Sequence, residues 1–358
     1  MAVPALSRRK LLSTAMLAAP AVMLGPMVAR GRETPLPVDA AEAFAPEPLD
    51  QALTTAEGFS RIHSLIIARN AEPYVERRFR GPALDATVNI KSASKAIIST
   101  LVGIAIDRGV LDGPDQRIGA LLADRIPDGA DPRVRDITLG MLMSMQAGLE
   151  RTSGRHYGRW VSSNDWVAFV LGQPMVDEPG GQMLYSTGNT HLISAILTRE
   201  SGESTLALAR SWLGGPLGVA FPPWDRDPQG IYLGGNNMGM SPRGLLRFGE
   251  MIRQGGTIGD TRVVSRDWID TALEPRTRSR YTDHGHGYGW FRYEADDGTP
   301  IHYAWGFGGQ MVYVIPDIAV TVVVTSDPYT GSATDRYNRA LHAMVADHIV
   351  PAARRADA

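Results

Sequence analysis

A chain of 358 residues is long enough to bury a sizeable hydrophobic core, in one large domain or in two closely packed ones. Apolar residues make up 44% of it and charged residues 21%, which is ordinary globular usage, and a net charge of −2 gives no general attraction to nucleic acid or anionic lipid. The lack of cysteine excludes thiol catalysis, disulfide bonds, thiolate metal sites and lipid anchoring through cysteine.

Residues 1–29 have the pattern of an export signal. Arg8 and Arg9 precede an apolar stretch of small residues that Pro20 and Pro26 interrupt. The pattern predicts a twin-arginine-type signal peptide, because the stretch is too short and too broken to favour the alternative, an uncleaved membrane anchor. We therefore expect a periplasmic or secreted protein with no membrane anchor once the signal is removed.

The composition of the remaining chain predicts one large domain. Residues 30–55, rich in proline, alanine and glutamate, are predicted to form a flexible lead-in. The domain then covers residues 56–350, with a mostly helical region inserted over about 96–255, and residues 351–358 form a tail.

Strand patterns lie at both ends of this domain, with helical patterns between them. Two apolar runs at 62–69 and 73–80 are joined as in a β-hairpin. Helical spacing is clearest over 96–107, 164–171, 189–200 and 242–253. Strand-like runs return at 287–293, 301–306, 310–315 and 319–325, and a last helix is predicted over 332–349. Links this short predict antiparallel pairing. The expected fold class is therefore α+β: an antiparallel sheet built from both chain ends and flanked by helices, with an inserted helical region.

The motif Ser92-Ala93-Ser94-Lys95 stands at the predicted start of the first long helix. A spacing of three on a helix places the hydroxyl of Ser92 and the amine of Lys95 on one face, within reach of each other. A helix N-terminus also offers free backbone N–H groups to a developing oxyanion. We therefore predict that Ser92 is a catalytic nucleophile; its rival Ser94 has no lysine three residues further on.

Lysine is rare in this chain. Among 36 basic residues only Lys10, Lys91 and Lys95 are lysines. An amine accepts a proton only when it is neutral, and burial or a nearby positive charge can achieve this for lysine but not for arginine. Lys95 is therefore predicted to be the base for Ser92, whereas Lys91 is expected to be a surface residue or an electrostatic neighbour.

A second element follows about ninety residues later. Pro179-Gly180 predicts a turn, and a short extended stretch ending in Tyr185 and Ser186 leads into the next helix. Such a tyrosine can accept the serine proton if an ammonium group stabilises its phenolate, although a single tyrosine is more often a core residue.

The order of these motifs is similar to that of the class C β-lactamase and penicillin-binding-protein superfamily, which includes family VIII-type esterases, D-amino-acid peptidases and 6-aminohexanoate-oligomer hydrolases. The resemblance covers about residues 60–350 and rests on Ser92-x-x-Lys95, 136–149, 179–187, 240–243 and 306–310. It implies a β-lactamase/transpeptidase-like fold, with Tyr185 as a third catalytic residue.

Two positions depart from the β-lactamase pattern. Thr187 stands where those enzymes have an asparagine that would contact the acyl amide, and Gly306-Phe307-Gly308 replaces Lys-Thr-Gly. The resemblance implies that Gly308 or Gly309 supplies a backbone N–H to the oxyanion hole.

Without a lysine at position 306, the predicted cleft lacks the usual cation for a substrate carboxylate. We therefore expect Trp305 and Phe307 to favour an uncharged acyl or alcohol group, unless an arginine from another loop reaches the site. Core packing is the expectation for Trp160, Trp166 and Trp290.

Other chemistries are less well supported. His284-Gly285-His286 has no carboxylate at ligand spacing, so we predict a loop at the mouth of the cleft rather than a metal site, and no cofactor. A Ser-His-Asp triad lacks its Gly-x-Ser-x-Gly motif.

The sequence thus predicts a serine hydrolase that cleaves a small ester or amide through a covalent acyl-enzyme, as a carboxylesterase or amide hydrolase. A β-lactamase or D-peptidase is the alternative. From another class, the alternative is a non-hydrolytic acyl-trapping sensor or peptidoglycan-binding module.

Overall fold

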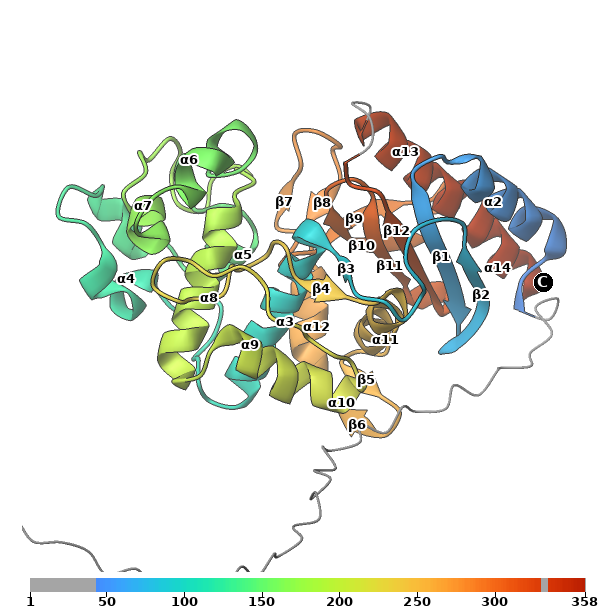
Figure 1. Ribbon diagram of the computed structural model, residues 1–358, viewed down its shortest axis with the longest axis horizontal. Helices are drawn as coiled ribbons and strands as arrows, with labels where there is room; N and C mark the ends of the chain where they lie inside the picture. The colour runs from blue at the N-terminus through green and yellow to red at the C-terminus, as the bar shows by residue number, and fades with distance from the viewer. Residues whose placement is uncertain (1–42, 330–333, 358) are drawn as a thin grey trace, which may run out of the picture. The chain divides into compact units, whose positions relative to one another are not determined.

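The structure is a computed structural model that describes residues 43–329 and 334–357. Its main feature is an antiparallel sheet of eight strands in the order β2-β1-β12-β11-β10-β9-β8-β7 (Figure 1). The strands are β1 (Ile62–Arg69), β2 (Glu72–Arg78), β7 (Thr277–Arg278), β8 (Gly285–His286), β9 (Phe291–Glu294), β10 (Pro300–Gly306), β11 (Gln310–Ile315) and β12 (Val320–Ser326). Because β1 pairs with β12, both ends of the domain build one sheet, which confirms the predicted α+β class.

The middle strands send alternate side chains into two cores. Along β11, Val312 and Val314 join the core that contains helix α11 (Pro242–Arg253). Met311 and Tyr313 join the core on the opposite face. There the sheet is covered by α2 (Pro46–Gly58), α13 (Thr334–Met344) and α14 (Val350–Ala356), which lie together at the right of Figure 1. The period of two follows from strand geometry, and cover on both faces explains why every residue of β12 is buried.

Helix α3 (Ser94–Asp107) lies between the sheet and the helical region. It contacts β10, α8 (Thr187–Ser201) and α12 (Arg266–Leu273), so its side chains are buried on almost every side. At Gly103 the helix passes so close to α12 that an added Cβ would lie 2.1 Å from the Trp268 ring. A glycine is therefore required at the point where α3 meets α12.

The rest of the helical region consists of shorter helices. They are α4 (Ile118–Leu121), α5 (Leu139–Met143), α6 (Tyr157–Val161), α7 (Trp166–Leu171), α9 (Thr205–Leu208) and α10 (Gly215–Leu217). None of the helices within residues 43–329 and 334–357 combines the length and apolar character needed to cross a bilayer.

Two predictions about the ends of the domain are wrong. Part of the expected lead-in, residues 30–55, belongs to α2, because Leu49, Ala52 and Ala56 form one apolar stripe that packs under the sheet. The expected tail, residues 351–358, is largely helix α14, whose Ala352 and Ala353 are buried. The predicted signal peptide lies outside the described residues.

The predicted strand over 287–293 is also shorter than expected. Residues 287–290 form a turn in which Gly289 has φ +82°, a value that favours glycine, so β9 begins only at Phe291.

Candidate active site

Ser92 lies in a single 3₁₀ turn, Lys91–Ala93, that leads directly into α3. Its hydroxyl lines a cavity of about 1000 Å³. The rival Ser94 is fully buried, and its hydroxyl donates to the carbonyl of Lys91 at 2.6 Å. Of the two serines in the motif, only Ser92 is therefore open to a substrate.

The amine of Lys95 is buried among neutral oxygen atoms. Its Nζ donates to Ser92 Oγ at 3.1 Å, to Thr187 Oγ1 at 3.1 Å and to the carbonyl of Gly235 at 2.6 Å. Lys95 forms no ion pair with any carboxylate of the described residues. Burial without a counter-ion lowers the pKa of Lys95 to about 7. A large share of these amines is thus neutral at pH 7, with a lone pair available to the serine.

Tyr185 completes the cluster from the short stretch before α8. Its ring lies over Lys95, with Nζ 5.0 Å from the ring centroid, and packs edge-on against Trp305 at 5.9 Å. Burial raises the pKa of Tyr185 well above its usual value, and a hydrogen bond with Ser92 offsets part of that rise. At neutral pH the phenol therefore keeps its proton.

Thr187, at the start of α8, lines the cavity and is hydrogen-bonded to Lys95. Besides accepting from Lys95, its Oγ1 shares a hydrogen bond with Ser153 Oγ at 3.0 Å, and its N–H donates to the same Ser153 oxygen at 2.8 Å. The hydroxyl of Thr187, which stands at the position of the asparagine in β-lactamases, is thus hydrogen-bonded to both Lys95 and Ser153.

The carbonyl of Gly235 is supplied by a loop that a buried polar pair holds in place. His191 Nε2 lies 3.1 Å from Asp227 Oδ2, with both side chains fully buried, and His191 Nδ1 accepts from the N–H of Gly234 at 3.4 Å. The hydroxyl of Thr190 donates to the carbonyl of Gly234 at 3.0 Å. Helix α8 therefore anchors the loop that binds the ammonium group.

Position 306 is a point of close backbone contact. A Cβ on Gly306 would lie 2.2 Å from the carbonyl oxygen of Ile90 and 3.3 Å from the N–H nitrogen of Ala93, so β10 passes directly against the turn that carries Ser92. The alternation of a strand places Trp305 and Phe307, but not residue 306, on the cavity. A side chain at position 306 would therefore not have pointed at a substrate.

The next two glycines form the turn between β10 and β11. Gly308 (φ +84°) approaches Pro328, and Gly309 (φ +92°) approaches Tyr337. The N–H of Gly309 donates to the carbonyl of Gly306 at 3.2 Å, so of the two glycines predicted as oxyanion donors only Gly308 has an N–H without an acceptor in the described part of the chain.

In the turn that carries Ser92 and the turn between β10 and β11, three backbone N–H groups have no acceptor in the described part of the chain. They belong to Ser92, Phe307 and Gly308. Ser92 and Gly308 are oxyanion donors that the sequence predicted. Phe307, which directly follows the close contact at Gly306, was not predicted, because its side chain gives no sign of a close backbone approach.

The two histidines of the 284–286 segment have separate environments. His284 lines the cavity and its Nδ1 bonds to Tyr303 Oη at 2.8 Å, while His286 is buried and its pKa is lowered to about 3 by burial. No group of three or more metal-binding side chains occurs among the described residues.

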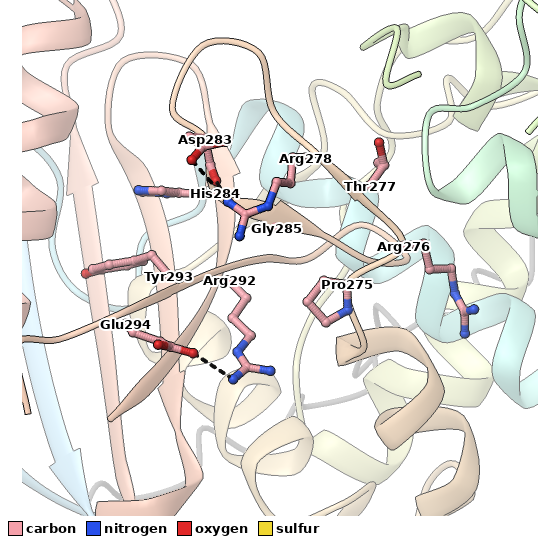
Figure 2. Close-up of a pocket in the computed structure, with 10 residues that line it drawn as sticks. All are labelled: Pro275, Arg276, Thr277, Arg278, Asp283, His284, Gly285, Arg292, Tyr293 and Glu294. Carbon is pink, nitrogen blue, oxygen red and sulfur yellow. Dashed lines mark hydrogen bonds and ion pairs between the residues drawn. The ribbon is translucent and has the colours of Figure 1, made fainter. Parts of the chain in front are cut away.

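A second cavity, of about 600 Å³, lies against β7, β8 and β9 (Figure 2). Its guanidinium groups are largely paired: Arg292 bonds to Glu294 at 3.0 Å and Arg278 to Asp283 at 3.1 Å. Its lining residues include no serine and no lysine, and we assign it no chemistry.

Comparison with known proteins agrees with this geometry. The family profile named Beta-lactamase matches residues 63–345, most of the chain. The chain belongs to the beta-lactamase family. It is 26% identical over 246 residues to the 6-aminohexanoate-dimer hydrolase of Paenarthrobacter ureafaciens, a match that covers 62% of this chain and 59% of that protein. The chain thus spans about three-fifths of that relative's length.

Solved beta-lactamase-family structures share the fold at lower identity. A penicillin-binding protein homologue from Caulobacter crescentus has a TM-score of 0.65 at 18% identity, covering 84% of this chain and 98% of its own. A family VIII carboxylesterase has a TM-score of 0.64 at 17% identity, covering 86% and 99%.

Several cavity residues of this beta-lactamase-family member were missed by the sequence reasoning. Four of them are cations or aromatics from three segments of the chain, namely Arg151, Arg280 with its neighbour Tyr281, and Tyr329. No motif joins them, so only the folded chain reveals their proximity. Of the four tryptophans considered, Trp305 lines the cavity, whereas Trp160, Trp166 and Trp290 are core residues.

The close packing of Gly235 yields a testable consequence. A Cβ there would lie 2.4 Å from Thr190 Oγ1 and 2.6 Å from Lys95 Cγ, so Gly235→Ala must displace the loop or the base. We expect Ser92 to react with a fluorophosphonate at least about tenfold more slowly, because a small misplacement of reacting groups has a large effect on rate.

The matched control for this variant is Gly230→Ala in the same loop. Gly230 also has positive φ, +89°, but open space around its Cβ position. It should show the cost of backbone strain alone, with labelling close to that of the wild type. Equal losses in the two variants would contradict the role given to the Gly235 carbonyl.

Proposed function

We propose that this protein is a serine hydrolase that cleaves an ester or amide bond through an acyl-enzyme on Ser92. The observation that carries the proposal is the buried Lys95 amine, which lies 3.1 Å from the hydroxyl of Ser92 and has only neutral acceptors. A lysine whose pKa is lowered to about 7 is only partly charged at neutral pH, and its neutral form can act as a general base.

In acylation, Ser92 Oγ attacks the substrate carbonyl carbon while its proton passes to Lys95 Nζ. The tetrahedral intermediate collapses with cleavage of the bond to the leaving group, which takes a proton from Tyr185 Oη. The Lys95 ammonium returns a proton to Tyr185, so the amine is neutral again. This assignment follows from the raised pKa of Tyr185, which makes the phenol a proton carrier rather than the resting base.

In deacylation, water attacks the acyl carbon and gives its proton to Lys95, and Ser92 Oγ leaves with that proton. The negative oxygen of both intermediates is bound by the N–H of Ser92 together with that of Gly308 or Phe307. Preorganised backbone donors of this kind stabilise charge that appears only as the reaction proceeds.

The proposed activity is that of a carboxylesterase or amide hydrolase. The support comes from relatives described as a 6-aminohexanoate-dimer hydrolase and a family VIII carboxylesterase. Aromatic side chains at the cavity, including Trp305 and Phe307, give the apolar part of an acyl or alcohol group a surface to pack on. β-Lactam hydrolysis, D-peptidase activity and acyl trapping without turnover are the outcomes to test against it.

Site of action is a further part of the proposal. The paired Arg8 and Arg9 and the apolar stretch after them support export to the periplasm or beyond by a twin-arginine-type signal. Changing both arginines to lysine should leave unprocessed precursor in the cytoplasm, as judged by cell fractionation and immunoblotting. Efficient export of this variant would indicate a general secretory signal instead.

Covalent labelling tests the nucleophile. A fluorophosphonate probe should modify the wild-type protein at Ser92, as mapped by mass spectrometry, and Ser92→Ala should lose both label and turnover of p-nitrophenyl butyrate. Ser94→Ala is the matched control and should keep the label. A burst of product followed by no turnover in the wild type would identify an acyl-trapping sensor; labelling of a different serine would contradict the assignment.

The pH profile tests the base. Below pH 7 the amine of Lys95 is protonated and cannot accept a proton, so kcat/KM for a neutral ester should rise with pH around an apparent pKa of about 7. Lys95→Arg and Lys95→Ala should both lose at least about a hundredfold and the pH step with it, because arginine stays protonated. Substantial activity in Lys95→Arg would mean that only the positive charge is required.

A further inference from the structure

Four cations line the cavity that opens onto Ser92, and we call them the cationic rim: Lys91, Arg151, Arg280 and Arg339. The same lining includes one carboxylate, Asp335. The histidines of the lining add no charge at neutral pH, because burial lowers the pKa of both His284 and His342. The space in front of the nucleophile is therefore surrounded by excess positive charge.

None of the four cations forms an ion pair within the described part of the chain. Lys91 Nζ donates to Tyr329 Oη at 3.1 Å and to Asn237 Oδ1 at 3.5 Å, and Arg151 donates to Tyr281 Oη at 2.5 Å. These neutral partners orient Lys91 and Arg151 without cancelling their charge. The second cavity differs, since two of its three arginines, Arg278 and Arg292, bond to carboxylates (Figure 2).

Lys91 is the member of the rim next to the nucleophile. Its backbone has φ +51°, a left-handed conformation unusual for lysine, and its N–H donates to Asn89 Oδ1 at 2.9 Å. Strained backbone of this kind persists where surrounding structure enforces it, and it tends to occur at functional sites. Here it accompanies a lysine side chain that lines the cavity beside Ser92.

Exposed aromatic rings accompany the cations. Tyr281, Phe307 and Tyr329 are 68%, 50% and 81% exposed, and all three line this cavity. Exposed aromatic side chains that gather at one opening are typical of ligand-binding surfaces. Positive charge beside apolar rings suits a molecule with an anionic group and an apolar body.

We propose that the cationic rim makes this protein selective for esters or amides that carry an anionic group, such as a carboxylate, near the scissile bond. The inference rests on the proposed hydrolase function and names its substrate class. It reverses the expectation of an uncharged substrate, which depended on the missing lysine at position 306. Cations from other parts of the chain supply the charge, and a side chain at position 306 would point at Ile90 rather than into the cavity.

Matched substrate pairs test this selectivity. p-Nitrophenyl hydrogen adipate carries the carboxylate on the acyl side, and para-carboxyphenyl butyrate carries it on the alcohol side; the methyl ester of each is its neutral partner. In at least one pair, kcat/KM for the acid should exceed that for the methyl ester by at least about tenfold. Raising NaCl from about 0.05 M to 0.5 M should reduce kcat/KM for the acid and leave kcat/KM for the methyl ester nearly unchanged, because salt screens the attraction between charges.

Variants of the rim locate the effect. Lys91→Gln should lower the ratio of kcat/KM for the acid to kcat/KM for its methyl ester by at least about fivefold, chiefly through a higher KM for the acid. Lys91→Arg, which keeps the charge, should retain most of the wild-type ratio. The triple change Lys91→Gln, Arg280→Gln and Arg339→Gln should abolish the preference. The control Arg77→Gln removes an exposed cation of β2 that does not line the cavity, and it should leave the ratio unchanged.

The inactive Ser92→Ala protein separates this proposal from the proposed function. Its dissociation constants for the acid and the ester of each pair, measured by calorimetry, report charge selectivity without turnover. Tighter binding of the acid supports the rim even if hydrolysis is not observed in the wild type. If both acids bind no more tightly than their methyl esters, the proposed selectivity of the cationic rim is wrong. Steady hydrolysis of the neutral esters by the wild type would still support the hydrolase function.

Discussion

A buried ammonium group without a carboxylate partner governs the arrangement around Ser92. Water would solvate the Lys95 amine far better than the interior does, so every acceptor it finds there matters. Two hydroxyls and one backbone carbonyl converge on Nζ, and none of them carries a charge. The result is an amine that loses its proton near pH 7 while staying held beside the serine. The loop at Gly235, the His191–Asp227 pair and the contact of Thr187 with Ser153 all serve that placement.

The two lysines at this site have opposite surroundings although they are four residues apart. Lys95 is enclosed by α3, α8 and the Gly235 loop, where burial removes its charge easily. Lys91 sits at the open side of the cavity beside Tyr329 and Asn237. A chain that uses arginine for nearly all of its cations thus has two of its three lysines on either side of the nucleophile in sequence. The lowered pKa of Lys95 allows it to accept a proton, and we propose that the positive charge of Lys91 binds the anionic group of the substrate.

The sequence predicted the fold well where periodicity was strong and local. β1, β11 and α11 have the predicted bounds, because alternation or helical spacing runs through each without interruption. The sequence did not predict helix α2, because its apolar stripe consists of only a few side chains among prolines and acidic residues. The Ser92–Lys95 pairing was predictable since both residues lie on one helical turn. The carbonyl of Gly235 was not, because a backbone acceptor leaves no mark in a sequence. Two further features could not be predicted from the sequence: the left-handed backbone of Lys91, and the close approach of Gly306 to the carbonyl of Ile90.

The neighbouring positions of β1 and β12 have a consequence for how the chain acquires its structure. Strands separated by some 250 residues of chain lie side by side in the middle of the sheet, and β10 presses against the turn that carries Ser92. The contacts that hold the sheet together at these points join distant parts of the chain, and such topologies fold slowly because long loops must close first. A growing chain cannot assemble the nucleophile's surroundings until its final strands have left the ribosome. Loss of the last strand, β12, would remove an interior strand rather than an edge and would separate the hairpin of β1 and β2 from the other strands of the sheet.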